Sequence, residues 1–387
     1  MYANGGNAIL NLSGGPIQGH QDQRGFPAVQ SLYRFVADNQ PYFNDDRSGA
    51  NVAIVYSQDT LFYYGRDQPK LNYVDAIRGA ELALSDAHIP FDLISDAVVK
   101  RGDLGKYRAI LLPSTACMSE ETAEALRSYV QGGGNVIATF ETSLFDTDGN
   151  RRSDFLLADL FGAAYHSTDS VMGEDNGVYK QSYLNVRAPE HPLLERLGAT
   201  SVIPASNRYC KVTANGNTSV PLTLSAPFRV FPEGMSYTQE PDTGMPMLIA
   251  KEHDGGGRTV YFPGQPDTAF ARAGYPDWAL LLVNAVRWTT GDRLPLSIDG
   301  PETLLATLRV QEGRRLVHLV NVNGGRRMFS ELIAARDVTV RLPFSGEFQP
   351  QRAFLLSDRS PLAVTQEQDA VIVTVPRVLD YDVVVFE

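Results

Sequence analysis

The chain has 387 residues, which is long for one hydrophobic core, so two or three domains are expected. Hydrophobic residues make up 43% and charged residues 20% of the chain, a composition typical of globular proteins that excludes intrinsic disorder. The formal net charge of −11 argues against a nucleic-acid partner, because phosphate binding requires clustered Lys and Arg side chains.

The segments that would indicate a membrane or an oxidising compartment are also missing from the sequence. No apolar run approaches the roughly 20 residues needed to cross a bilayer, and no signal segment opens the chain, so we expect no membrane partner. Cys117 and Cys210 are too few for a disulfide framework. A reducing cytoplasm is therefore the expected location.

The first 49 residues form an unusual start. The pattern predicts a short strand at 8–12, ended by Gly and Pro residues, and a helix at 27–39, followed by a linker at 44–49. One strand and one helix cannot bury their apolar faces on each other alone. We therefore expect this segment to lean on a neighbouring domain or on a module absent from the chain.

Residues 50–293 alternate strands and helices. Strands are predicted at 52–56, 91–94, 109–112 and 135–140, with helices at 73–87, 119–131 and 154–161. Ser119 is the expected N-cap of the second helix. The strands are apolar throughout, which is typical of strands covered by helices on both faces. This pattern predicts an α/β domain with a doubly wound, flavodoxin-like parallel sheet.

A second pattern follows the sheet. Strands separated by loops, at 183–186, 209–212, 222–224 and 247–250, indicate a β-rich insertion over about 165–257. A glycine-rich hairpin turn, a strand at 259–262 and a helix at 277–289 return the chain to the sheet. Residues 294–387 carry regular short strands between turns, which predicts a C-terminal antiparallel β-sandwich.

Ligands of a doubly wound sheet usually bind at the carboxyl ends of its strands. The loop after the first of these strands, at 57–71, is long and aromatic and has no glycine-rich phosphate motif. The six histidines show no metal-ligand spacing. We therefore expect neither a cofactor nor a metal, and keep His20, in a Gly-flanked loop with Asp22 and Arg24, as a weak candidate for binding substrate.

Two residues are weak candidates for catalysis. Cys117 follows a strand and precedes a helix, where a nucleophile could lie, but its loop is longer than a tight nucleophile turn, and a partly buried loop thiol is the favoured interpretation. Glu141 closes a strand and could act as acid, base or sugar ligand, or could cap the next loop. Glycoside hydrolysis needs two opposed carboxylates, and the sequence does not place a second one.

Phe62, Tyr63 and Tyr64 are the candidates for binding substrate. Aromatic rings suit either the face of a sugar or a subunit interface, and core packing is the structural alternative.

The segment YVQGGGNV at 129–136, with 109–113 and 119–122 before it, resembles the middle domain of the family 42 β-galactosidases. The strand at 315–321 is similar to one that recurs in the terminal β domains of that family. The resemblance implies a class I glutamine amidotransferase-like fold that mediates trimerisation, with a small β domain behind it. It also implies that residues 8–39 correspond to the last strand and helix of a (β/α)8 barrel, and that the two catalytic glutamates lie in the rest of that barrel.

Amidotransferases carry a nucleophilic cysteine after the strand that corresponds to 135–140, where this chain has Glu141. We therefore hypothesise a non-barrel portion of a glycoside hydrolase that acts in oligomer assembly and shapes a carbohydrate site, as a homo-oligomer or with a partner barrel. Two alternatives remain open: an independent hydrolase that uses Cys117 or Glu141, and a stand-alone sugar-binding protein that uses the loop at 61–64. The sequence does not identify the sugar or the linkage.

Overall fold

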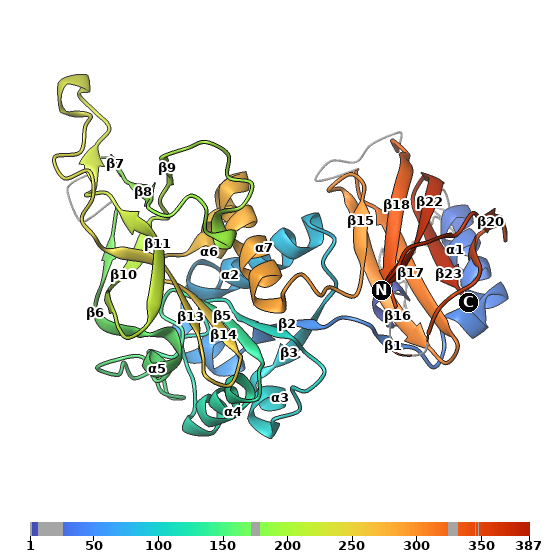
Figure 1. The fold of residues 1–387 in the computed structure, drawn as a ribbon, viewed down its shortest axis with the longest axis horizontal. Coiled ribbons are helices and arrows are strands. Elements are labelled where there is room, and N and C mark those ends of the chain that lie inside the picture. Colours follow the sequence, from blue (N-terminus) through green and yellow to red (C-terminus); the bar gives the residue numbers. More distant parts are fainter. Residues whose placement is uncertain (1, 7–25, 172–178, 324–331, 345, 347) are drawn as a thin grey trace, which may run out of the picture. The chain divides into compact units, whose positions relative to one another are not determined.

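The structure is a computed structural model that describes residues 2–6, 26–171, 179–323, 332–344, 346 and 348–387 (Figure 1). The predicted strand at 8–12 and the candidate His20 lie outside the described residues. The chain forms two compact units: unit 1 comprises Met1–Ala50, His88–Pro90 and Pro295–Glu387, and unit 2 comprises Asn51–Ala87 and Phe91–Leu294. None of the helices in the described ranges is long and apolar enough to cross a membrane.

The described part of unit 2 is organised around a mixed sheet with the strand order β3-β2-β4-β5-β14-β13-β11-β8-β9. Five neighbouring strands run parallel: β3 (Phe91–Ser95), β2 (Val52–Tyr56), β4 (Ala109–Leu112), β5 (Asn135–Thr139) and β14 (Arg258–Phe262). Four antiparallel strands extend the sheet: β13 (Pro246–Glu252), β11 (Thr218–Leu224), β8 (Tyr183–Val186) and β9 (Val202–Pro204). The predicted α/β class is confirmed, and part of the predicted insertion continues the main sheet.

The helices of unit 2 fall into two groups (Figure 1). The first group packs together and comprises α2 (Asp75–Asp86), α6 (Pro266–Ala273) and α7 (Pro276–Thr290). The second pairs α3 (Asp96–Arg101) with α4 (Glu120–Gln131). Helix α4 begins where predicted, because the Ser119 hydroxyl accepts a hydrogen bond from the Thr122 amide at 3.2 Å. Helix α2 passes so close to α6 that a Cβ at Gly79 would lie 1.9 Å from the Asp267 carbonyl oxygen, so only glycine fits.

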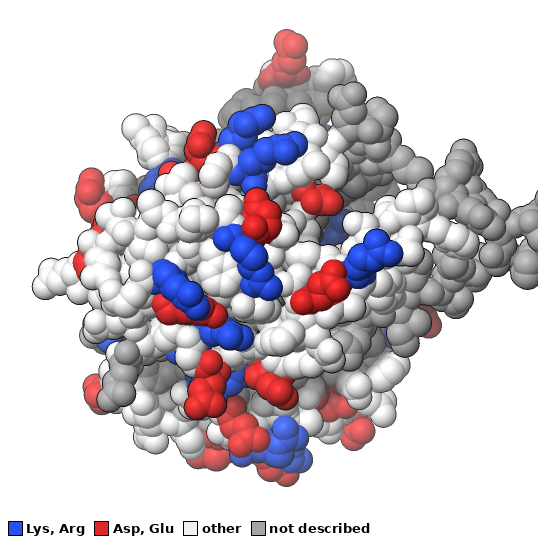
Figure 2. All heavy atoms as spheres, turned by 90° about the vertical axis from the view of Figure 1, so that its right-hand side faces the viewer, with Lys and Arg blue, Asp and Glu red and all other residues white. Residues whose placement is uncertain are grey.

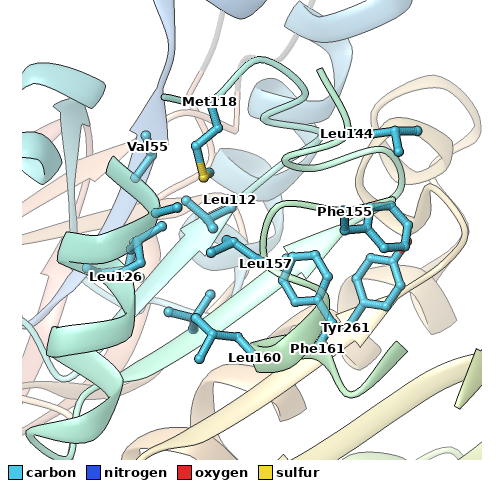
Figure 3. Packing of buried hydrophobic residues seen from close by; sticks show 14 of the residues in the cluster. Val55, Leu112, Met118, Leu126, Leu144, Phe155, Leu157, Leu160, Phe161 and Tyr261 are labelled. Carbon is cyan, nitrogen blue, oxygen red and sulfur yellow. The ribbon is translucent and has the colours of Figure 1, made fainter. Parts of the chain in front are cut away.

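The core of unit 2 joins the sheet to α4 and to the short helix α5 (Ala158–Phe161). Leu126 of α4 packs with Leu112 of β4 among the aliphatic residues, and Phe155 and Phe161 gather around Tyr261 (Figure 3). The rings of Phe161 and Tyr261 stack with their centroids 4.5 Å apart. These residues form a closely packed cluster that supports the carboxyl ends of β4 and β5.

Three segments of unit 2 differ from the prediction. The region expected as a loop at 57–71 contains the π-helix η3 (Thr60–Gly65), and η4 (Lys70–Val74) leads into α2. The helix predicted at 154–161 is limited to α5. Strand β6 (Ala163–Ser170), which pairs with β10 (Arg208–Ala214), was not predicted, because its polar sequence lacks the alternation of a half-buried strand.

Unit 1 contains two antiparallel sheets. The first has the order β1 (Arg47–Ser48), β16 (Leu304–Gln311), β17 (Arg314–Asn321), β23 (Tyr381–Phe386), β19 (Ala353–Leu355) and β20 (Pro361–Leu362). The second has the order β15 (Ser297–Asp299), β18 (Ala335–Pro343), β22 (Ala370–Val378) and β21 (Thr365–Gln366). One core cluster takes side chains from both sheets, including Val317 of β17 and Val340 of β18.

The described part of the N-terminal segment belongs to unit 1. Helix α1 (Phe26–Asp38) contacts the C-terminal strands through Phe35, whose ring centroid lies 5.9 Å from that of Tyr381. Arg309 forms an ion pair with Asp46 at 2.6 Å, and β1 pairs with β16. Residues 26–50 therefore lean on the C-terminal strands of the same chain.

The charged side chains are mixed in sign. On the face drawn in Figure 2, scattered Lys and Arg side chains lie beside Asp and Glu side chains, among other residues that cover most of the area. Pairs such as Arg341 with Asp369, at 2.6 Å, bring opposite charges together. The described residues of this face form no continuous basic area of the kind that a nucleic-acid backbone requires.

Candidate functional site

The candidate residues gather at the carboxyl edge of the parallel strands in unit 2. Strand β2 lies between β3 and β4, so the order of the strands reverses at β2, and such a reversal leaves a crevice at the carboxyl ends of the strands. A cavity of about 210 Å³ lies there, with Asp59, Asp96 and Cys117 among its lining residues. The crevice is small and partly acidic.

Cys117 lines this cavity but is only 3% exposed. Burial, with the negative charges of Asp59 and Asp146, raises the pKa of the thiol to about 12. The thiol therefore stays protonated near neutral pH and is a poor nucleophile. None of the described residues that line the cavity is a histidine that could act as its base.

Glu141 is 1% exposed, and both of its carboxylate oxygens accept hydrogen bonds. The Tyr64 hydroxyl donates to Oε2 at 2.7 Å, and Arg151 Nη2 donates to Oε1 at 2.9 Å. The Thr168 hydroxyl also donates to Oε1. Glu141 thus joins three elements, η3, the loop after β5, and β6, in one buried network.

Tyr64 and Cys210, two titratable groups beside Glu141, are held in their uncharged forms. Burial, and then the neighbouring charge of Glu141, raise the pKa of Tyr64 well above its ordinary value. The same two causes raise the pKa of Cys210, a free and fully buried thiol within reach of Thr168. Among its described partners Glu141 has no second carboxylate, whereas glycoside cleavage uses two. The arrangement suits a structural ion pair.

The strained residue after β5 is Phe140, not Glu141. Phe140 has a φ of +53° and is fully buried, and the Tyr261 hydroxyl donates a hydrogen bond to its carbonyl oxygen at 2.7 Å. A nucleophile elbow places its reactive residue on such a strained turn. Here that place is taken by a side chain that cannot attack a substrate.

The three consecutive aromatic residues of η3 point to different surroundings. Phe62 and Tyr63 are 65% and 44% exposed, whereas Tyr64 is largely buried against Glu141. Leu71 and Val74 on η4, which packs against η3, are also exposed. We call the exposed residues Phe62, Tyr63, Leu71 and Val74 the η3–η4 surface.

The structure therefore brings Tyr64 and Glu141 together and places Cys117 in the crevice beside η3, where its amide donates to Thr60 Oγ1 at 3.0 Å. Sequence reasoning missed Arg151 and Thr168. Neither carries a motif, and Thr168 lies on the strand that the pattern did not predict.

The comparison with known families bears on the same region. Residues 50–187 match the family model of the β-galactosidase trimerisation domain. The predicted resemblance to the middle domain of the family 42 β-galactosidases is confirmed.

Solved structures with similar folds include glycoside hydrolases. The α-L-fucosidase isoenzyme 2 from Paenibacillus thiaminolyticus matches with a TM-score of 0.70 at 18% identity, over 95% of this chain and 53% of its own. The β-galactosidase from Bacillus circulans sp. alkalophilus matches with a TM-score of 0.66 at 17% identity, over 95% and 46%. The β-galactosidase from Rahnella sp. R3 gives 0.65 at 16% identity, over 95% and 45%. The chain thus spans about half the length of these proteins, and at these identities the likeness shows a shared fold.

Proposed function

We propose that this protein is the non-barrel, assembly-forming portion of a bacterial glycoside hydrolase of the β-galactosidase type, with a role in carbohydrate metabolism. In this proposal unit 2 drives formation of a homo-oligomer and shapes a sugar site on a (β/α)8 barrel. The observation that carries the proposal is the match of residues 50–187 to a trimerisation domain, in a unit whose buried carboxylate, Glu141, is engaged by three donors.

We also infer the finer fold classes. For unit 2, the strand order β3-β2-β4-β5-β14 and the two groups of helices support a doubly wound, flavodoxin- and amidotransferase-like domain. For unit 1, the core cluster shared by the two antiparallel sheets supports a β-sandwich.

The η3–η4 surface is the part of unit 2 that we assign to self-association. Its residues fall within the matched range, and a second copy of this chain is the occupant that a trimerisation domain requires. Exposed Phe and Tyr side chains are enriched at such interfaces. A sugar would meet only Phe62 and Tyr63 here, because Tyr64 is turned toward Glu141.

The two free cysteines, Cys117 and Cys210, support a reducing cytoplasmic location.

Size-exclusion chromatography with light scattering, run beside a panel of aryl β-galactosides and α-fucosides, tests the proposal. We expect the mass of an oligomer of this chain, with three copies as the predicted number, and no cleavage of any glycoside by the chain alone. A monomer that cleaves one of these glycosides unaided would contradict it.

A further inference from the structure

A second cavity of unit 2, of about 560 Å³, has a volume typical of small-molecule sites. One wall is formed by β7 (Lys180–Gln181), the start of β8 and residues 204–208, and the other by α6 and the beginning of α7, elements that can be followed in Figure 1. Two hydrogen bonds join the walls. Trp278 Nε1 donates to the Pro204 carbonyl oxygen at 3.0 Å, and the backbone N–H of Gln265 donates to Ser206 Oγ at 2.9 Å. The cavity is therefore a formed feature of the fold.

Arg208 lines this cavity, and its guanidinium group has no partner among the described residues. Its carbon Cζ lies 4.9 Å from the centroid of the Phe140 ring, which supports the flat face of the group. Among the hydrogen bonds and ion pairs of the described residues, none involves this guanidinium. The nearby carboxylate of Glu141 is already paired with Arg151 at 2.9 Å. The five N–H donors of Arg208 are thus available to a ligand.

Gln265 presents a second unused polar group. It follows β14, is 5% exposed, and lines the cavity, yet its side-chain amide has no hydrogen-bond partner among the described residues. The oxygen and nitrogen of this amide are not among the buried polar atoms that lack a partner, so they are accessible to a ligand. An amide both donates and accepts hydrogen bonds, which suits the hydroxyl groups of a sugar.

The remaining lining adds an aromatic face and positive charge. Tyr275 is 49% exposed and packs edge-on against Trp278, with ring centroids 5.2 Å apart. Rings of this kind pack against the apolar face of a sugar. The described lining residues include Lys180, Arg208 and Arg272 but no Asp or Glu. Arg272 is paired with Asp75, outside the lining, at 2.8 Å, and Lys180 also has an interaction partner, which leaves Arg208 as the group we assign to an anion.

We propose that this cavity binds a small saccharide that carries an oxyanion, either the carboxylate of a uronic acid or a phosphate ester. Arg208 holds the oxyanion through paired N–H groups, Gln265 bonds a ring hydroxyl, and the face of the sugar lies on Tyr275. Arg208 also lies close to Tyr64 of the Glu141 network, but binding at this cavity requires neither hydrolysis nor self-association.

Isothermal titration of the full chain tests the proposal with four probes: galactose, galacturonate, galactose 6-phosphate and inorganic phosphate. We expect at least one of the two charged sugars to bind roughly tenfold or more tightly than galactose and than inorganic phosphate. The charged sugar that binds more tightly identifies the source of the oxyanion. Galactose or inorganic phosphate binding as tightly as the tighter of the two charged sugars, or no binding by either charged sugar, would overturn the proposal.

Variants locate the binding. Arg208→Gln is expected to weaken binding of the tighter charged sugar by about tenfold or more. Gln265→Glu, as a separate variant, is expected to weaken this binding even more, because the new carboxylate repels the oxyanion. Arg336→Gln, a matched change on the exposed surface of β18, is expected to leave binding unchanged. Thermal melts show whether each variant is folded. Unchanged binding in a folded Arg208→Gln variant would contradict the assignment.

Discussion

Buried polar side chains of the two units differ in how completely their hydrogen bonds are satisfied. In unit 2, Glu141 and Asp267 lie among hydrogen-bond donors, and Asp267 accepts from Thr139 Oγ1 at 2.6 Å and from the Thr268 amide at 2.7 Å. In unit 1, the fully buried His318 bonds the Tyr381 hydroxyl at 2.8 Å through Nδ1, while its Nε2 has no partner among the described residues. Unit 2 therefore contains a polar network at its sheet edge, and unit 1 contains a buried histidine with one ring nitrogen left unpartnered.

This comparison distinguishes buried charged groups that hold the fold together from polar groups that are free to bind a ligand. A buried carboxylate with several donors, such as Glu141, holds elements together and has no free oxygen with which to act on a substrate. The donors that we assign to ligand binding in unit 2 lie elsewhere, at Arg208 and Gln265. The predictions below test this contrast, beginning with the largest effect.

Removing the carboxylate of Glu141 is expected to cost the most. Glu141→Ala leaves Arg151 and two hydroxyl donors without their acceptor, so unit 2 should lose on the order of 3 kcal/mol of unfolding free energy. Both tryptophans of the chain, Trp278 and Trp288, lie on α7, so urea unfolding followed by tryptophan fluorescence reports on unit 2. Glu124→Ala on the exposed face of α4 is the control, with an expected effect below about 0.5 kcal/mol. A loss as small as the control's would contradict the structural role.

His318 makes unit 1 sensitive to acid. Burial lowers the pKa of His318 from 6.5 to about 4, against which the charge of Asp46 acts only in part. The folded state therefore binds fewer protons than the unfolded state between these values, and stability is lost as the pH falls from 6.5 toward 4, by up to about 3 kcal/mol. Hydrogen exchange of β17 and β23 in urea measures this loss, and His318→Phe should abolish it. If the stability of unit 1 falls equally with pH in the wild type and in His318→Phe, the assignment to His318 is refuted.

Asp267 gives the stability of unit 2 the opposite dependence on pH. Burial raises the pKa of Asp267 from 3.8 to about 6, although its hydrogen bonds oppose the shift. The folded state then binds more protons than the unfolded state between these values, so stability falls as the pH rises through this window, by roughly 2 to 3 kcal/mol. Asp267→Asn should flatten this dependence in tryptophan-monitored urea titrations. A variant that keeps the wild-type slope would show that another group causes it.

The smallest effect concerns the two thiols. Because Cys117 has a pKa raised to about 12 and Cys210 is fully buried, a disulfide reagent should label the native chain about a thousandfold more slowly than free cysteine. In the urea-unfolded chain both thiols should react as fast as free cysteine. Fast reaction of one thiol per native chain would revive Cys117 as a nucleophile.

The sequence predicted the sheet core well, because β2 and β4 are short continuous apolar runs between helices with a regular apolar stripe. The cap at Ser119 followed from local chemistry in the same way. The partners of Glu141 could not be predicted, since Thr168 lies on a polar strand that forms only through pairing with β10. Nor could sequence show which of three adjacent aromatic residues turns inward, because that depends on the π-helical turn of η3.

Sedimentation equilibrium of the wild-type chain and of the double variant Phe62→Ser/Tyr63→Ser tests the central claim, that unit 2 self-associates through the η3–η4 surface. Phe231→Ser/Tyr237→Ser, which changes exposed aromatic residues elsewhere in unit 2, is the matched control. The account predicts an oligomer for the wild type and the control and a folded monomer for Phe62→Ser/Tyr63→Ser. A monomeric wild type, or a double variant with the wild-type mass, would contradict it.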